Sequence, residues 1–220
     1  MIESVMTNEM GVKHGVLFDL DGVLVDTEGT YSEFWSSIDS RYPTGVEGFS
    51  QVIKGMNLQE ILGNYFASAS VRAAVVNELA SFQRAMRYDY FPGAMELVMA
   101  LRDAGLATAV VTSSDQGKVD ALCRQHNEFA DLFDVIITGD IVTHAKPHPE
   151  CYLLAARQLG CRPQDCFVFE DSINGLKAGM ASGATVIGLT TTYPASAVAP
   201  LCHYVTNGLK GLTIEKMMML

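Results

Sequence analysis

Short apolar runs alternate with helical segments through the second half of this 220-residue chain. Each run is too short for a helix of ordinary length and is rich in residues that favour strands. Strands joined through helices run parallel and are covered on both faces. The alternation therefore predicts an α/β fold with a mostly parallel sheet. The expected strands are residues 107–112, 135–138, 167–169 and 185–189, and the expected helices are residues 92–104, 115–125, 149–159 and 173–182.

An earlier strand ends in acidic residues. The apolar run 16–18 leads directly into Asp19, Leu20 and Asp21, and Gly22 permits a sharp exit from the strand. Side chains two positions apart on extended backbone point the same way, so Asp19 and Asp21 are expected to face one pocket. Their repulsion is relieved by a divalent cation or by protonation of one carboxyl group as an acid. Taken alone, the same residues also fit an ordinary Asp-Gly turn.

Polar residues also stand at the ends of later strands. The strand that ends at Thr112 continues into Ser113, and another strand runs into Glu170 and Asp171. Ligands of parallel sheets bind at the carboxyl ends of the strands, so we expect these side chains around one site. Each has a more ordinary alternative, since serine and aspartate often cap the next helix. Lys146, just before another helix, would ordinarily be a solvated surface charge.

Residues 29 to about 90 have the spacing of helices and contain no run that favours a strand. Phe34, Trp35 and Ile38 share one helical face, and a second such face runs from Leu58 to Phe66. This pattern predicts a helical insertion that covers the strand-end pocket. The predicted domains are an α/β core, residues 1–28 and 91–220, and a helical domain, residues 29–90.

The charge of the chain excludes two classes of partner. The formal net charge is -10 at pH 7, whereas nucleic acid or an anionic membrane requires a basic face. Residues 1–11 lack the apolar run of a signal peptide, and no segment approaches transmembrane length. We therefore expect a cytoplasmic, monomeric protein that acts on a small molecule and binds neither nucleic acid nor membrane.

The cysteines and histidines show no metal-binding pattern. The five cysteines form no C-x-x-C pair, and their odd number argues against a disulfide framework. Cys161 and Cys166 lack a matching Cys or His pair and are interpreted as packed thiols. His144 and His148 have no identifiable partner in the sequence and are interpreted as loop residues, not ligands.

Taken in order, the strand-end residues resemble the four signatures of the haloacid dehalogenase-like hydrolase superfamily. Residues 19–27 match D-x-D-G-V/T-L-x-D-S/T, and the strand ending at Thr112 matches the second signature. Lys146 begins the third, K-P-x-P, and Glu170 with Asp171 begins the fourth, E-D-S-x-x-G-x-x-A-x-x-A-G. The chain is similar to the β-phosphoglucomutase-like and phosphatase branch. That resemblance implies a Rossmann-like core with a small helical cap domain inserted after the first strand.

The same resemblance implies a Mg²⁺-dependent phosphatase that hydrolyses a small phosphomonoester through an aspartyl-phosphate. Asp19 would be the nucleophile and Asp21 the acid and base. Thr112, Ser113 and Lys146 would bind the phosphoryl group. Mg²⁺ would be held by Asp19, the backbone carbonyl of Asp21, Asp171 and Glu170, the last directly or through water.

Two alternatives are a sugar phosphate mutase resembling β-phosphoglucomutase and a catalytically silent scaffold. A mutase of that kind holds a second phosphate with cations, and its arginine, histidine and lysine align here with Leu58, Tyr31 and Asp115. Their absence predicts hydrolysis, although Lys54 is a possible replacement for the arginine. The scaffold would need a broken catalytic position, and none is found. Substrate specificity is expected to depend on residues of the helical domain, with Tyr31, Lys54 and Asn57 as candidates.

Overall fold

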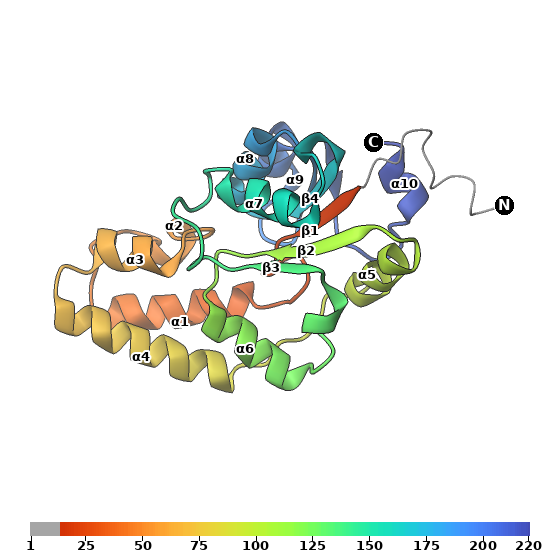
Figure 1. The fold of residues 1–220 in the computed structure, drawn as a ribbon. Coiled ribbons are helices and arrows are strands. Elements are labelled where there is room, and N and C mark those ends of the chain that lie inside the picture. The colour runs from red at the N-terminus through yellow and green to blue at the C-terminus, as the bar shows by residue number, and fades with distance from the viewer. Residues whose placement is uncertain (1–13) are drawn as a thin grey trace.

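One parallel sheet organises residues 14–220, the part of the chain that the computed structural model describes (Figure 1). Within these residues six strands lie in the order β3-β2-β1-β4-β5-β6, and every neighbouring pair is parallel. The predicted α/β fold is confirmed. Strand β6 was not predicted, because three residues are too few to show a period. The strands are β1 (Gly15–Phe18), β2 (Ala107–Val111), β3 (Val135–Ile137), β4 (Cys166–Glu170), β5 (Thr185–Leu189) and β6 (Tyr204–Thr206).

The strand order brings the predicted polar residues to one edge of the sheet. Strand β1 lies between β2 and β4, and all three run in the same direction. Asp19, Thr112 and Glu170 therefore stand at neighbouring carboxyl ends. The chain first builds the sheet to one side of β1 and then crosses to the other side. The end of β1 is thus the switch point at which sheets of this kind bind ligands.

Both faces of the sheet are buried, which explains why its central strands are apolar throughout. Val16 and Phe18 pack on one face in a cluster with helices α5 (Ala94–Asp103) and α6 (Gln116–Gln125). Leu17 packs on the other face with α7 (Glu150–Leu159) and α8 (Ile173–Ser182). The remaining short elements after β5 are α9 (Ala195–Val198) and α10 (Ile214–Met218), and turns of 3₁₀ helix lie at Ala130–Leu132, Pro163–Asp165 and Ala199–Leu201.

The first four helices after β1 lie together beside the sheet, coloured orange to yellow in Figure 1. They are α1 (Glu28–Arg41), α2 (Phe49–Val52), α3 (Leu58–Tyr65) and α4 (Ala69–Ala85). They share an apolar cluster of their own, in which Trp35, Ile38 and Leu79 are buried. We propose that residues 29–90 form an inserted domain and that, of the described residues, 14–28 and 91–220 form the core; the predicted core residues 1–13 lie outside the described part of the chain.

The chain leaves and re-enters the sheet region along paired segments. Val25 forms an antiparallel bridge to Tyr90, and the Asp26 amide donates to the Asp89 carbonyl at 2.9 Å. The Phe91 amide in turn donates to the Leu24 carbonyl at 2.9 Å. These bonds fix the outgoing and returning segments side by side. The helices between them are therefore anchored next to the end of β1.

No helix within residues 14–220 has both the length and the apolarity needed to cross a membrane. The segment 1–11, for which no signal peptide was predicted, lies outside the described residues.

The contact between α8 and β4 gives a test of the fold. A Cβ added at Gly175 would lie 1.7 Å from Oε1 of the buried Glu170. We expect Gly175→Ala to lower the free energy of unfolding by about 1–3 kcal/mol, as overpacking does. Gly63→Ala is the matched control, because this exposed glycine in α3 has open space around it. It should raise stability by up to about 1 kcal/mol. Urea unfolding measures both, and equal stabilities for the two variants would contradict the packing.

Candidate active site

A cavity of about 790 Å³, including its open mouth, lies where the sheet edge meets the helices α1 to α4. Residues from the strand ends form one wall, and residues from the helical region form the other. From the sheet side come Asp19, Asp21, Thr112, Ser113, Lys118, Lys146 and Asp171, and from the helical side come Glu28, Tyr31, Lys54 and Gln83. The structure thus brings together most of the predicted site residues.

Lys146 is buried and joins three strands, so it is not a solvated surface charge. Its ammonium group donates to Asp19 at 2.5 Å, to the Val111 carbonyl at 3.0 Å and to Glu170 at 2.6 Å. Burial acts to lower the pKa of Lys146, but the carboxylates of Asp19 and Glu170 outweigh burial and hold that pKa above its ordinary value. The lysine therefore stays charged.

Asp19, Glu170 and Asp171 form a buried acidic cluster, with one carboxylate oxygen from each lying within 4.8 Å of the others. Burial raises the pKa of Asp19 well above its usual range, even though Lys146 opposes this. Burial also raises the pKa of Asp171, to which the charges of Glu170 and Asp19 add. One lysine does not neutralise three carboxylates. Negative charge in the cluster is therefore only partly compensated. A set of donors that are all oxygen suits a hard divalent cation.

The three acidic side chains are not equally free to bind a cation. Glu170 Oε1 accepts hydrogen bonds from Lys146 and from the Tyr152 hydroxyl, the latter at 2.8 Å. Its Oε2 accepts from the amides of Asp171 and Ser172 at 3.0 Å each. Glu170 is therefore fixed by protein donors. The Asp171 carboxylate accepts from the Thr192 hydroxyl and keeps further oxygen lone pairs for a cation.

Gly22 allows Asp171 to approach the end of β1. Its φ is 76°, a left-handed conformation that favours glycine, and an added Cβ would lie 2.0 Å from Asp171 Oδ2. The sharp exit predicted at Gly22 is therefore present, and the missing side chain also makes room for the acidic cluster.

Asp21 lies in a different environment from Asp19. Its carboxylate accepts hydrogen bonds from the Thr27 hydroxyl, from the Lys118 ammonium group and from the Ser114 hydroxyl, the last at 3.0 Å. Burial acts to raise the pKa of Asp21, but the ion pair with Lys118 and these hydrogen bonds outweigh it, so that the pKa is lowered. The carboxylate of Asp21 is not part of the acidic cluster. Only its backbone carbonyl remains a candidate ligand.

Lys118 was not predicted as a site residue. It is almost completely buried, pairs with Asp21, and its ammonium group lies 3.8 Å from the centre of the Tyr31 ring. A signal for it was present in the sequence. A lysine in the first turn of a helix faces the positive end of the helix dipole, which is unfavourable unless a carboxylate compensates.

Two lysines besides Lys146 line the pocket: Lys54, the possible replacement for the mutase arginine, and Lys118. Asp115 does align with the lysine of the mutase, but Lys118 enters the same cavity from the first turn of α6. Each lysine of the cavity has a carboxylate partner. Lys54 bonds to Glu28 at 2.8 Å, Lys118 to Asp21, and Lys146 to Asp19 and Glu170.

The hydroxyl residues after β2 divide into two kinds. The Thr112 oxygen accepts a hydrogen bond from the Ser114 amide at 3.0 Å, which leaves its own proton free to donate. Ser113 instead donates to the Gly55 carbonyl at 2.9 Å and so ties the sheet edge to the helical region. Neither serine caps the next helix. That position belongs to Asp115, whose side chain accepts from the Lys118 amide at 3.0 Å.

The predicted specificity residues differ in position. Tyr31 and Lys54 line the main cavity, and the Tyr31 hydroxyl lies beside the side chain of Gln83, a hydrogen-bonding neighbour that lines the same cavity. Asn57 lies outside that cavity and lines a smaller one beside Thr112 and Ser113. Its side chain caps α3 by accepting from the Glu60 amide at 2.9 Å.

The family model for haloacid dehalogenase-like hydrolases matches residues 13–183. This stretch holds β1 to β4 and the whole acidic cluster. The chain belongs to this hydrolase family. The resemblance predicted from the four strand-end motifs is confirmed, and with it the assignment of the chain as a hydrolase.

Relatives and solved structures agree with this assignment. Hexitol phosphatase A of Escherichia coli (strain K12) is 32% identical over 182 residues, which cover 80% of this chain and 82% of that protein. Validoxylamine A 7'-phosphate phosphatase of Streptomyces hygroscopicus subsp. limoneus is 32% identical over 194 residues, or 83% of this chain and 88% of that protein. The fold is shared with β-phosphoglucomutase from Clostridium difficile, with a TM-score of 0.78 at 19% identity over 94% of this chain and 96% of that chain.

Similar regions also occur inside longer proteins. The chain spans 19% of Protein SUPPRESSOR OF QUENCHING 1, chloroplastic, of Arabidopsis thaliana, with 30% identity over 202 residues. It spans 55% of the bifunctional riboflavin kinase/FMN phosphatase of the same plant, with 27% identity over 219 residues.

The environments of Asp171, after β4, and of Asp21, after β1, predict opposite effects of neutral substitutions on stability in the metal-free protein. Because the pKa of Asp171 is raised in the folded state, its contribution to stability is complete below about pH 4 and is lost as pH rises. The pKa of Asp21 is lowered, so its contribution is present above about pH 4 and is lost as pH falls. At neutral pH, Asp171→Asn should hold or raise stability. Asp21→Asn should cost about 3 kcal/mol, because it leaves Lys118 buried without its partner.

Urea unfolding in chelator across the acid to neutral range measures both differences. The two variants should diverge from wild type in opposite directions as pH rises. A destabilisation of Asp171→Asn as large as that of Asp21→Asn would show that the acidic cluster carries no repulsion.

Proposed function

We propose that this chain is a phosphatase that hydrolyses a small phosphomonoester through an aspartyl-phosphate on Asp19. The observation that carries the proposal is the contrast between the two aspartates at the end of β1. Asp19 lies in the acidic cluster beside Lys146, and Asp21 has separate hydrogen bonds of its own. Burial alone favours a protonated Asp19, so the proposal requires Lys146 and a cation in the acidic cluster to keep that carboxylate ionised as the nucleophile, while Asp21 handles protons.

In the proposed first step, a carboxylate oxygen of Asp19 attacks phosphorus as the bond from phosphorus to the leaving oxygen breaks. Asp21 gives its proton to that oxygen, which departs as an alcohol. In the second step, water attacks the phosphorus of the aspartyl-phosphate, and Asp21 accepts the proton. Phosphate leaves, and the Asp19 carboxylate is regenerated. Lys146 balances the charge on the phosphoryl oxygens, and the free proton of Thr112 is directed to one of them.

The ion pair with Lys118 favours the ionised form of Asp21, which suits the second step. The first step needs a proton on Asp21. When the substrate enters, Asp21 takes up a proton from water and then gives that proton to the leaving oxygen. We therefore assign Lys118 a positioning role, in which it keeps Asp21 ionised until the substrate enters.

The acidic cluster fits Mg²⁺, because its donors are all oxygen and their charge is only partly compensated. Asp19 and Asp171 would bind the ion directly, the backbone carbonyl of Asp21 would complete the set, and Glu170 would act through water because protein donors already hold it. Bound there, Mg²⁺ supplies positive charge to the phosphoryl oxygens.

The substrate is proposed to be the phosphate of a neutral polyhydroxy compound, such as a sugar or sugar alcohol. The lysines of the cavity are paired with carboxylates, so a second anionic group would have to displace Glu28 or Asp21. The uncharged polar side chains of Tyr31, Ser32 and Gln83, which also line the cavity, instead favour a substrate with hydroxyl groups. Two relatives are named as hexitol and validoxylamine A 7'-phosphate phosphatases.

The monomeric state and the cytoplasmic location of the protein remain predictions.

The second candidate is a sugar phosphate mutase, which Lys54 and Lys118 favour because both line the cavity. A mutase must grip a second phosphate, and each charge-assisted hydrogen bond that it needs is worth roughly 1.5–3 kcal/mol. Lys54 and Lys118 already form such bonds with Glu28 and Asp21, so neither is free to hold a second phosphate. Hydrolysis is therefore favoured over the mutase reaction. A silent scaffold would need a broken catalytic position, and no described residue of the four motifs shows one.

Product analysis tests the proposed function. The protein is incubated with β-glucose 1-phosphate and a catalytic amount of the 1,6-bisphosphate, and in parallel with a panel of sugar and sugar alcohol phosphates. We expect release of inorganic phosphate from at least one monoester, without accumulation of glucose 6-phosphate. Asp19→Asn is the control and should retain less than about one per cent of the rate. Glucose 6-phosphate forming faster than phosphate would establish the mutase instead.

Removal of the metal should abolish activity. We expect exhaustive treatment with EDTA to eliminate phosphate release and Mg²⁺ to restore it, because the acidic cluster would otherwise repel the substrate. Ca²⁺ should restore little, since it accepts more ligands in looser geometry and disturbs the alignment of Asp19 with phosphorus. Unchanged activity in the chelated protein would refute the metal requirement.

A further inference from the structure

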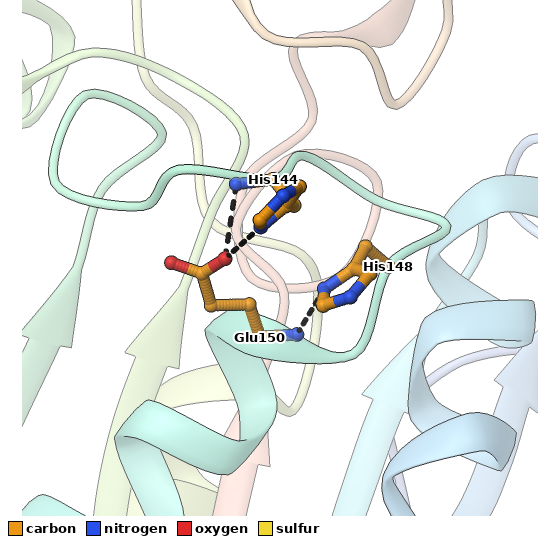
Figure 2. Close-up of side chains that lie close together, drawn as sticks. All are labelled: His144, His148 and Glu150. Atoms are coloured by element: carbon orange, nitrogen blue, oxygen red, sulfur yellow. Dashed lines mark hydrogen bonds and ion pairs between the residues drawn. The ribbon is translucent and has the colours of Figure 1, made fainter.

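His144 and His148 are loop residues, as predicted, but the structure gives them partners that the sequence did not show. Both lie beside Glu150 on the surface, as Figure 2 shows. Nδ1 of His144 lies 2.6 Å from a carboxylate oxygen of Glu150. The two imidazole rings face each other with their centres 4.6 Å apart and their planes inclined by 34°. The sequence did not reveal this group, because it arises from a turn that folds the loop back onto the start of α7.

The backbone under this group is held in place. The Glu150 carboxylate also accepts hydrogen bonds from the amides of Thr143 and His144, at 2.8 and 3.0 Å. The His148 amide donates to the Ala145 carbonyl at 2.9 Å, and the Glu150 amide donates to Nδ1 of His148 at 3.3 Å. The loop therefore presents its two imidazoles and one carboxylate from a fixed frame.

We propose that His144, His148 and Glu150 form a surface binding site for a transition-metal ion. One ligand atom from each residue lies within 4.8 Å of the other two. In a tetrahedral zinc site, bonds of about 2.0–2.2 Å place neighbouring ligands a little over 3 Å apart. The side chain of His144 is 61% exposed, and His148 is also exposed, so small rotations of the rings close this difference without disturbing the core.

The donor set determines which ions fit. Two imidazole nitrogens and one carboxylate favour Zn²⁺, Ni²⁺ or Cu²⁺, whereas Mg²⁺ prefers oxygen ligands alone. Three protein ligands leave at least one position open to water. The site thus differs in chemistry from the buried cluster of Asp19, Glu170 and Asp171, whose donors are all oxygen.

The location gives the site a structural consequence. Lys146 lies in the loop between the two histidines, and its ammonium group bonds to Asp19 and Glu170. An ion held by both histidines and by Glu150 would tie the two ends of this short loop to the first residue of α7. The proposal does not depend on the proposed function, because binding is measured without turnover.

The test is a Zn²⁺ titration of the untagged full chain against a chromophoric chelator, with Mg²⁺ in excess to occupy the acidic cluster. We expect one Zn²⁺ to bind, and His148→Ala to weaken that binding by at least about tenfold, since even changes around metal ligands reach this size. His203→Ala is the matched control, an exposed histidine whose Nδ1 accepts from the Val186 amide at 2.9 Å. It should bind Zn²⁺ as wild type does.

Three results would overturn the proposal. They are no Zn²⁺ binding by wild type, equal binding by wild type and His148→Ala, and equal losses in the His148 and His203 variants. Asp171→Asn separates the two sites of the chain. If it loses the Zn²⁺ that His148→Ala retains, the ion belongs to the acidic cluster and not to the surface loop. Circular dichroism of each variant confirms that a loss of binding is not a loss of fold.

Discussion

The buried ammonium group of Lys146 is the interaction on which the catalytic edge of the sheet depends. It bonds to Asp19 after β1, to the Val111 carbonyl of β2 and to Glu170 of β4, so that one side chain joins three neighbouring strands. Without it, two carboxylates would be buried with no positive charge, which costs several kcal/mol. Even with it, negative charge remains in excess, because Asp171 adds a third carboxylate. This excess of negative charge lowers the stability of the metal-free protein, and it also favours the binding of a cation at the site.

A second ion pair, between Lys118 and Asp21, gives two aspartates that lie only two residues apart different environments. Burial raises the pKa of Asp19, whereas the lysine and two hydroxyl groups lower that of Asp21 against the effect of burial. Lys118 also packs against the ring of Tyr31 in α1. Asp21, to which we assign the proton transfers, is therefore coupled to the helical region that lines the other wall of the cavity. A change in that wall on substrate entry would reach Asp21 through Lys118.

The helical region is attached to the sheet edge by direct hydrogen bonds beside the cavity. Ser113 donates to the Gly55 carbonyl, and the Asn174 side chain donates to the Lys54 carbonyl at 3.3 Å. Both bonds reach the short segment between α2 and α3. The residue that pairs with Glu28 at the cavity wall, Lys54, belongs to this segment. Groups that contact the non-phosphate part of a substrate are thus fixed against the groups that we propose react with its phosphate.

The sequence by itself determined the class of fold and the acidic strand ends, because both are local. The length and the continuous apolar character of a run identify a strand that is buried on both faces. Asp19 and Asp171 directly follow such strands, and Glu170 ends one. It did not identify Lys118 or the partners of His144, and it missed β6. Only the tertiary structure decided these, because each depends on neighbours far along the chain or on the path of a turn. Lys118 meets Asp21 across 97 positions, and no local pattern records such a contact. The direction of a pKa shift also depends on the tertiary structure, because burial and charges from distant parts of the sequence determine it.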